Sequence, residues 1–319
     1  MPLVLIPDNT KIKFVSKNKL CLALSVLMIL GTIALVAFRG INFGIDFTGG
    51  ALIEIQTEKP ANLDSLRKGL GNVSIQTSGT VNDVTIRIPL ATNDSEEQAK
   101  IVNAAKEKIS AHAGSKVDFR RVDFVGPQVG EELIGKAIYA LLGAFGAIML
   151  YVWFRFEWQY GVGGLMALMH DAIAVIGFYA VTQIEFNLTS VAAILTVIGY
   201  SINDSVVIYD RMRENLRKYK KMPLPEMIDL TVNETLPRTL MTSVTTLFAL
   251  IALIAFGGEV LASFSWGTAF GIIIGTYSSI YVSALMLLVF KPNRNFETKK
   301  EGAATNGGAN GKAEAKWVE

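Results

Sequence analysis

Six long apolar runs constrain this sequence more than any other feature. A helix of about 20 apolar residues crosses the hydrocarbon core of a bilayer. Lipid offers the backbone no hydrogen-bond partners, so apolar segments of this length are expected to be helical. Of the 319 residues, 51% are hydrophobic, which predicts an integral membrane protein. The expected spans are Leu20–Phe38, Leu133–Phe154, Tyr160–Gln183, Phe186–Tyr209, Arg238–Phe256 and Phe264–Phe290.

Basic residues lie at alternate ends of these runs and indicate the orientation. Lys11, Lys13 and Lys17 precede the first run, and a basic cluster within 211–221 separates the fourth run from the fifth. Because Lys- and Arg-rich flanks stay in the cytoplasm, we expect both termini inside. No small-residue cleavage pattern closes the first run, so it is expected to remain as an anchor. The expected organisation is a cytoplasmic N-terminus at 1–19, a first span at 20–38, a periplasmic domain at 39–130, a bundle at 131–290 with a cytoplasmic loop at 210–237, and a disordered cytoplasmic tail at 291–319.

Residues 39–130 have the patterning of a small domain outside the membrane. Four short segments rich in β-formers predict strands, and two segments with helical spacing predict helices. Their order, β-α-β-β-α-β, is that of the ferredoxin-like α+β fold. The strands are expected at Ala51–Thr57, Val73–Thr77, Val84–Pro89 and Lys116–Val125, and the helices at Asn62–Gly71 and Ser95–Ala111.

The fourth run contains a carboxylate deep in an otherwise apolar segment. An ionisable side chain at such a depth costs at least ~2.5 kcal/mol, so its presence indicates a function. On a helix, Asp204 shares one polar face with Thr196, Tyr200 and Asn203, because these residues follow i, i+4, i+7 and i+8 spacing. Lipid cannot satisfy this face, so it is expected to meet other helices or a water-filled path.

The fifth run begins at Arg238, and Thr242 continues its polar face. Residues 226–236 before it are expected to form a separate amphipathic helix at the inner interface. Two interpretations of Arg238 are open: it extends to the headgroups and forms a static pair with Asp204, or the pairing changes with conformation. Burial favours the neutral form of a carboxylic acid and a nearby guanidinium favours the charged form, so a changing pair takes up and releases a proton. A proton crossing with the membrane potential supplies ~2.3 kcal/mol per 100 mV.

Other polar and small residues are candidates for supporting roles. Asp171, beside His170 in the third run, is either a hydrogen-bond partner between helices or part of a proton relay. Asp46, Gly49 and Gly50 follow the first run, where paired glycines permit backbone conformations that other residues avoid, and they predict a rigid elbow between membrane and domain. The sixth run carries glycines at four-residue spacing, which lets helices approach closely. These are Gly267, Gly271 and Gly275.

The composition argues against several other functions. Cys21 is the single cysteine, so there is no disulfide framework and no cysteine-based metal site. The two histidines do not form an HExxH motif, which argues against a zinc hydrolase. A net charge of +2 gives no indication of nucleic-acid binding. No Ser-His or paired-Asp arrangement points to an intramembrane protease, so we expect a protein that is not an enzyme and has no cofactor or metal.

Three segments resemble the SecF family of bacterial protein-export subunits. They are GIDFTGG after the first run, VIGYSINDSVVIYDRMREN across the fourth, and FGGEV with GTYSSIY before and within the sixth. The resemblance extends from Leu5 to Phe290, and the motif in the fourth run favours SecF over SecD. One departure is Pro237, which stands before Arg238 where the family pattern has Ser or another small polar residue. The residue at which the fifth helix begins is therefore less well determined by the sequence. The position of Arg238 is thus less well determined than that of Asp204.

The resemblance implies a polytopic α-helical membrane protein with six transmembrane helices in an RND-like half-bundle and a small ferredoxin-like periplasmic domain. It also implies an auxiliary subunit of the Sec translocase that uses the proton motive force to promote export of preproteins across the bacterial inner membrane after SecA-driven translocation. The family's proton-coupling Asp and Arg correspond to Asp204 and Arg238; carboxylates serve H⁺ and Na⁺ alike, and the family favours H⁺. The implied partners are SecD in a shared bundle, the SecYEG channel, YajC, YidC, unfolded secretory polypeptides and membrane lipid.

Two other functions fit parts of the sequence. A structural scaffold of the translocon predicts that neutralising Asp204 leaves export intact in an assembled complex. An RND-type exporter of lipids or drugs requires twice as many spans and two large outer domains in one chain, so this sequence would supply half of such a transporter.

Overall fold

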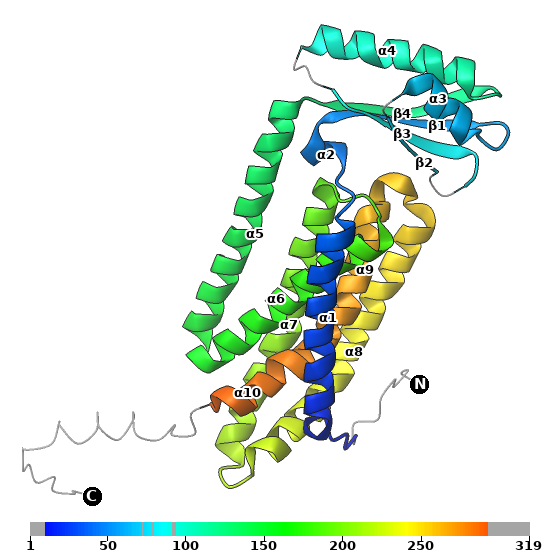
Figure 1. The fold of residues 1–319 in the computed structure, drawn as a ribbon. Helices are drawn as coiled ribbons and strands as arrows, with labels where there is room; N and C mark the ends of the chain where they lie inside the picture. The colour runs from blue at the N-terminus through cyan, green and yellow to red at the C-terminus, as the bar shows by residue number, and fades with distance from the viewer. Residues whose placement is uncertain (1–9, 72, 78–79, 91–93, 293–319) are drawn as a thin grey trace, which may run out of the picture.

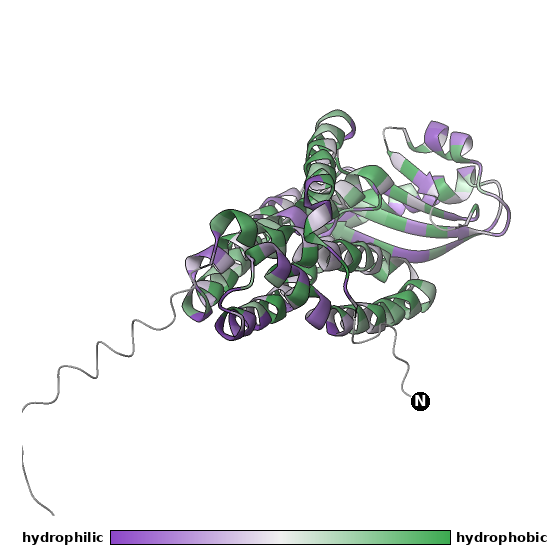
Figure 2. Ribbon diagram, turned by 90° about the horizontal axis from the view of Figure 1, so that it is seen from below, coloured by the Kyte–Doolittle hydropathy of each residue, from purple (hydrophilic) through white to green (hydrophobic). Residues whose placement is uncertain are grey.

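The computed structural model describes residues 10–71, 73–77, 80–90 and 94–292. A bundle of long helices carries a small domain of sheet and helices at one end, named the outer end, and the opposite end is named the inner end (Figure 1). Within the described part, six helical stretches are long and apolar enough to cross a membrane, and hydrophobic residues follow most of their length (Figure 2). The predicted polytopic fold class is therefore confirmed. The bundle contains α1 (Asn18–Arg39, after a 3₁₀ turn at Val15–Lys17), α5 (Pro127–Arg155), α6 (Trp158–Thr182), α7 (Leu188–Lys218), α8 (Leu224–Phe256), and a last span in which α9 (Gly258–Ser278) continues through a π-helical turn, η2 (Ser279–Ser283), into α10 (Ala284–Phe290).

The outer domain has the predicted ferredoxin-like topology. Its strands form one antiparallel sheet in the order β2-β3-β1-β4, and both helices cover the same face (Figure 1). Successive side chains of a strand point to opposite faces, so alternate residues such as Ile53 and Ile86 are fully buried against Leu66 and Ile109 of the helices. The elements are β1 (Gly50–Thr57), α3 (Leu63–Leu70), β2 (Ser74–Thr77), β3 (Asp83–Ile88), α4 (Ser95–His112) and β4 (Val117–Val125).

The fourth and fifth spans extend beyond their predicted limits. α7 continues to Lys218 and α8 begins at Leu224, so residues 219–223 connect them in place of the predicted loop at 210–237. The separate helix predicted at 226–236 is instead the first part of α8, which continues through Pro237. The prediction that a helix begins near Arg238 is therefore wrong, and Arg238 lies in the middle of a 33-residue helix.

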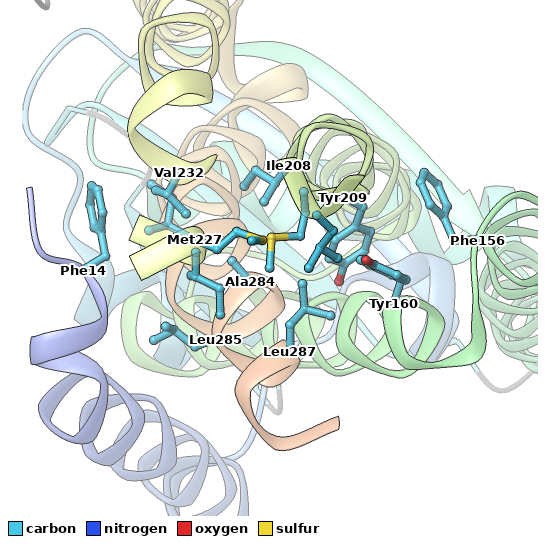
Figure 3. Close-up of a cluster of buried hydrophobic side chains, with 14 of the residues drawn as sticks. Phe14, Phe156, Tyr160, Ile208, Tyr209, Met227, Val232, Ala284, Leu285 and Leu287 are labelled. Carbon is cyan, nitrogen blue, oxygen red and sulfur yellow. The ribbon is translucent and has the colours of Figure 1, made fainter. Parts of the chain in front are cut away.

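Buried contacts between the inner ends of α7 and α8 explain this continuation. Ile208 of α7 shares one apolar cluster with Met227 and Val232 of α8 (Figure 3). Tertiary packing of an apolar face supplies most of the stability of a helix, so both helices persist past the expected end of the membrane segment. A proline is tolerated inside a membrane helix where neighbouring helices and Ser or Thr side chains satisfy the freed backbone groups.

The last span packs closely against α6 and α7 through its glycines. A Cβ atom added at Gly267 would collide with the hydroxyl of Tyr179, and one added at Gly271 would collide with the side chain of Val197. At Gly275 the added Cβ would lie 3.2 Å from the Cβ of Ser201. The three glycines thus form the surface along which the last span approaches its two neighbours.

Gly271→Leu is expected to destabilise the bundle by about 1–3 kcal/mol, because extra side-chain atoms in a close-packed contact force backbone shifts. The matched control is Gly199→Leu on α7, where an added Cβ meets no atom within 4 Å. Thermal unfolding of the detergent-solubilised protein measures both. Equal midpoints for the two variants would contradict the close approach at Gly271.

Candidate functional site in the membrane bundle

Asp204 is a buried carboxylate near the middle of α7. The helix begins with a capping box in which Asn187 and Ser190 bond each other's backbone amides, and it continues without a break to the inner side. Asp204 is 2% exposed, and its Oδ2 is buried without a hydrogen-bond partner among the described residues. Burial of an unpaired polar group is unfavourable, and burial of an unpaired charge far more so. This position therefore favours a carboxyl group that can change its protonation state or its partner.

Arg238 lies on α8, and its positive charge acts on Asp204. Even so, no ion pair of 4.0 Å or less joins the two side chains in the part of the chain that the structure describes. The guanidinium is exposed on the surface of the isolated chain, whereas the carboxylate is buried. The structure thus brings the two predicted residues into electrostatic range without direct contact.

The remaining residues of the predicted polar face separate into different environments. Tyr200 donates a hydrogen bond to Ser243 of α8 at 3.3 Å, and Ser243 lies 2.7 Å from the hydroxyl of Thr276 on α9. Thr242 bonds the carbonyl oxygen of Thr239 in its own helix, and Asn203 is exposed on the surface of the isolated chain. Tyr200, on the helix that carries Asp204, therefore links three helices, whereas no hydrogen bond joins Thr242 or Asn203 to the carboxylate among the described residues.

Asp171 has an environment opposite to that of Asp204. It is fully buried, and its Oδ2 accepts hydrogen bonds from Ser201 of α7 at 2.5 Å and Ser278 of α9 at 2.7 Å. The Nδ1 of its neighbour His170 lies 3.0 Å from the other oxygen. This carboxylate thus joins α6, α7 and α9 at one point. Of the two interpretations left open by the sequence, the arrangement favours the hydrogen-bond partner over the relay.

The sequence analysis missed the serines that complete this network. Ser201 lies one helical turn before Asp204, and Ser278 is the last residue before the π-helical turn. Beyond that turn, Ser283 donates to the hydroxyl of Tyr209 on α7 at 2.6 Å. The detectable signal was the segment YSSIYVS, where three serines interrupt an apolar run. Isolated serines in membrane helices are common at helix contacts, so the pattern alone did not identify their partners.

The predicted elbow connects α1 to β1 through a short helix, α2 (Ile45–Thr48). Gly49 has φ +67° and Gly50 has φ +127°, in the region that glycine adopts without strain. An added Cβ at Gly50 would also lie 2.8 Å from the carbonyl oxygen of Ile88. Asp46 accepts a hydrogen bond from the backbone amide of Leu188 at 2.9 Å, so the elbow contacts the outer end of the helix that carries Asp204.

A cavity of about 1010 Å³ lies between the uncovered face of the sheet and the outer end of the bundle. Its lining includes Glu54 and Arg121 from the sheet and Glu185 from the turn between α6 and α7. Burial raises the pKa of Glu54, the guanidinium of Arg121 opposes this, and the negative charges of Asp123 and Glu185 add to it. The cavity is thus lined by charges of both signs. Within the described ranges, no group of three or more His, Cys, Asp or Glu side chains could hold a metal ion.

Comparisons with known proteins relate this arrangement to one family. The family model described as "Protein export membrane protein SecD/SecF, C-terminal" matches residues 105–293, and the one described as "SecD/SecF GG Motif" matches residues 34–61. The Protein translocase subunit SecF of Rickettsia rickettsii (strain Sheila Smith) is 46% identical over 303 residues, which cover 93% of this chain and 97% of the relative. The subunit of the same name from Rickettsia felis (strain ATCC VR-1525 / URRWXCal2) is 45% identical with the same coverage.

Two solved structures are also similar. SecDF from Thermus thermophilus, a translocon-associated membrane protein, has a TM-score of 0.80 and 34% identity, covering 90% of this chain and 39% of that chain. SecDF in a super-membrane-facing form has a TM-score of 0.66 at 34% identity, covering 89% of this chain and 39% of that chain. The chain thus spans about two fifths of SecDF and nearly the full length of its SecF relatives. With this identity over nearly the full length of its relatives, the chain belongs to the SecF family of accessory subunits of the Sec protein translocase.

Proposed function

We propose that this membrane subunit, together with SecD, uses the proton motive force to promote export of unfolded polypeptides through the SecYEG channel of the inner membrane. Its match to 39% of the SecDF chain supports SecD as the source of the remaining part of a shared bundle. The exposed guanidinium of Arg238 and the exposed Asn203 support a polar partner surface against this side of the chain. Both termini lie in the cytoplasm in this proposal, because basic residues surround the turn between α7 and α8.

The observation that carries the proposal is the contrast between the two intramembrane carboxylates. Asp171 has its hydrogen bonds satisfied from three helices, whereas a buried oxygen of Asp204 has no partner among the described residues. Hydrogen bonds offset much of the cost of burying a polar group, whereas a buried carboxylate oxygen without a partner is stabilised by taking up a proton or by the approach of a cation. Asp204 is therefore the carboxylate whose charge can change during a transport cycle.

The proposed cycle alternates two states of Asp204 and Arg238. A proton arriving from the outer side neutralises Asp204, which then remains buried without Arg238. Release of the proton to the cytoplasm restores the negative charge, and this charge attracts the guanidinium and shifts α7 relative to α8. A proton moving with the potential supplies ~2.3 kcal/mol per 100 mV, which is sufficient to change the populations of two conformations that differ by a few kcal/mol. The cycle needs no cofactor and no covalent chemistry.

The test is preprotein export into inverted membrane vesicles that contain SecYEG, SecD and this chain, supplied with SecA and ATP. Export is measured with a proton gradient, with a sodium gradient and with neither, and each condition is repeated in vesicles without this chain. We expect the proton gradient to stimulate export only when the chain is present. Equal stimulation in its absence, with equal amounts of SecYEG and SecD, would favour a structural scaffold. Stimulation by the sodium gradient alone would replace H⁺ by Na⁺ as the coupling ion.

A further inference from the structure

The elbow, residues 42–50, is fastened to the turn between α6 and α7 by backbone hydrogen bonds. The amide of Gly44 donates to the carbonyl oxygen of Phe186 at 2.8 Å, and the amide of Phe186 donates to the carbonyl oxygen of Asn42 at 2.8 Å. The aromatic rings of Phe43, Phe47 and Phe186 pack together with centroids 5.8–6.2 Å apart. The chain that leads into the outer domain is thus paired with the chain that leads into α7.

Arg87 of β3 connects the sheet itself to this junction. Its guanidinium donates to the carboxylate of Glu185 at 2.7 Å and to the side-chain oxygen of Asn42 at 2.7 Å. The side chains of Arg87 and Glu185 are only 15% and 24% exposed. Partial burial strengthens charge-assisted hydrogen bonds of this kind. Arg87 therefore holds the sheet, the elbow and the α6–α7 turn with a single side chain.

The covalent connections of the outer domain would not by themselves fix its orientation relative to the bundle. The domain joins the membrane part at Gly50, where β1 begins, and at Pro127, where α5 begins. These two connections lie next to each other, since a Cβ added at Gly49 would be 3.0 Å from the Cα of Pro127. Two adjacent connections act as one pivot, about which the domain can swing. The contact of Arg87 with Glu185 adds a non-covalent attachment beside this pivot and restricts the orientation of the domain.

Asp46 extends the junction to α7. Its carboxylate accepts from the amide of Leu188, the first residue of the helix, where negative charge is favoured by the helix dipole. Asp204 lies 16 residues further along the same helix, which corresponds to ~24 Å at 1.5 Å per residue. The residue that contacts the start of the helix thus belongs to the elbow of the outer domain.

We propose that Asp46 and Arg87 are positioning residues that join the outer domain, the elbow and the outer end of α7 into one rigid body. When α7 is displaced at Asp204, the outer domain then moves together with the helix. The source of that displacement rests on the proposed proton coupling, whereas the rigid attachment does not.

The attachment is tested by the distance between two spin labels in the full chain, reconstituted with SecD and lacking its native thiol through Cys21→Ser. The labels are placed by Asn103→Cys on α4 and Val181→Cys at the outer end of α6, both at exposed positions. We expect a narrow distance distribution in the parent and a broad one after Arg87→Ala. A narrow distribution that persists in an Asp46→Ala/Arg87→Ala double variant would overturn the proposal.

Export measurements on variants distinguish the attachment role of Asp46 from proton coupling at Asp204. Asp46→Ala is expected to lose most of the gradient-dependent export while basal export driven by SecA and ATP continues at a similar rate. Asp46→Asn is the matched control, because its amide oxygen still accepts from Leu188 and should preserve the response. A full response in Asp46→Ala overturns the role of Asp46. A full response in Asp204→Asn would instead contradict the proton coupling, and the spin-label distances would still report on the attachment.

Discussion

Asp204→Asn is expected to abolish the gradient-dependent part of preprotein export and to leave the part driven by SecA and ATP unchanged. Asparagine has nearly the same shape as aspartic acid, but it can neither bind nor release a proton. The variant should be about as stable as the parent, because it exchanges a carboxyl group with one unpartnered buried oxygen among the described residues for an amide of the same shape. The measurement is export into inverted vesicles with and without an imposed proton gradient, normalised to the amount of assembled complex.

The matched control is Asp210→Asn, the same chemical change less than two helical turns further along α7. Asp210 lies at the inner end of the bundle, where its carboxylate bonds Arg155 at 2.7 Å and its side chain is 58% exposed. Exposed ion pairs contribute about 0–1 kcal/mol, so this variant should export and respond to the gradient like the parent. If Asp204→Asn retained its full response, the structural scaffold would become the better interpretation. If both variants lost it, the effect would arise from α7 in general and not from the buried carboxylate.

The elements that sequence analysis predicted well are those determined by local patterns. The strands of the outer domain are short segments rich in β-forming residues, and the two helices that cover them have helical spacing, so the β-α-β-β-α-β order could be assigned without long-range information. The span count followed from the length of the apolar runs. Asp204 was identified because a carboxylate in an apolar helix is conspicuous in any context.

The errors arose where tertiary contacts determine the local structure. The loop predicted at 210–237 is mostly helix because Ile208 packs against Met227 and Val232, residues that are distant in sequence. Pro237 favours a helix boundary when only local preferences are considered, but the packed bundle carries α8 through it. A rule based on neighbouring residues cannot anticipate either result.

The arrangement around the candidate site was also beyond prediction, because its contacts are long-range. Asp171 and Ser278 are 107 positions apart, and Arg87 and Glu185 are 98 positions apart. The two carboxylates could be identified from the sequence, but the sequence does not show which of them has hydrogen-bond partners on neighbouring helices. That distinction separates the roles of Asp171 and Asp204, and it depends on where two serines lie.

Asp171→Ala is expected to destabilise the bundle by about 2–4 kcal/mol without removing the gradient response of the complex that still assembles. The substitution leaves His170, Ser201 and Ser278 without their shared acceptor in a fully buried site. Hydrogen bonds between membrane helices contribute about 0.6 kcal/mol on average and up to about 1.7 kcal/mol each, and loss of a buried acceptor adds the cost of unpaired donors. Unfolding in mixed micelles of dodecyl maltoside and SDS measures the change in stability.

Asp171→Asn distinguishes this structural role from a proton relay. Its amide oxygen can still accept from Ser201 and Ser278, so we expect a smaller loss of stability than in Asp171→Ala and near-normal assembly. A residue that joins helices is replaceable by any side chain that preserves those two hydrogen bonds, whereas a proton relay requires a group that titrates. Assembled Asp171→Asn complex should therefore show the full gradient-dependent export. Normal assembly combined with loss of the response would place Asp171 on the proton path alongside Asp204.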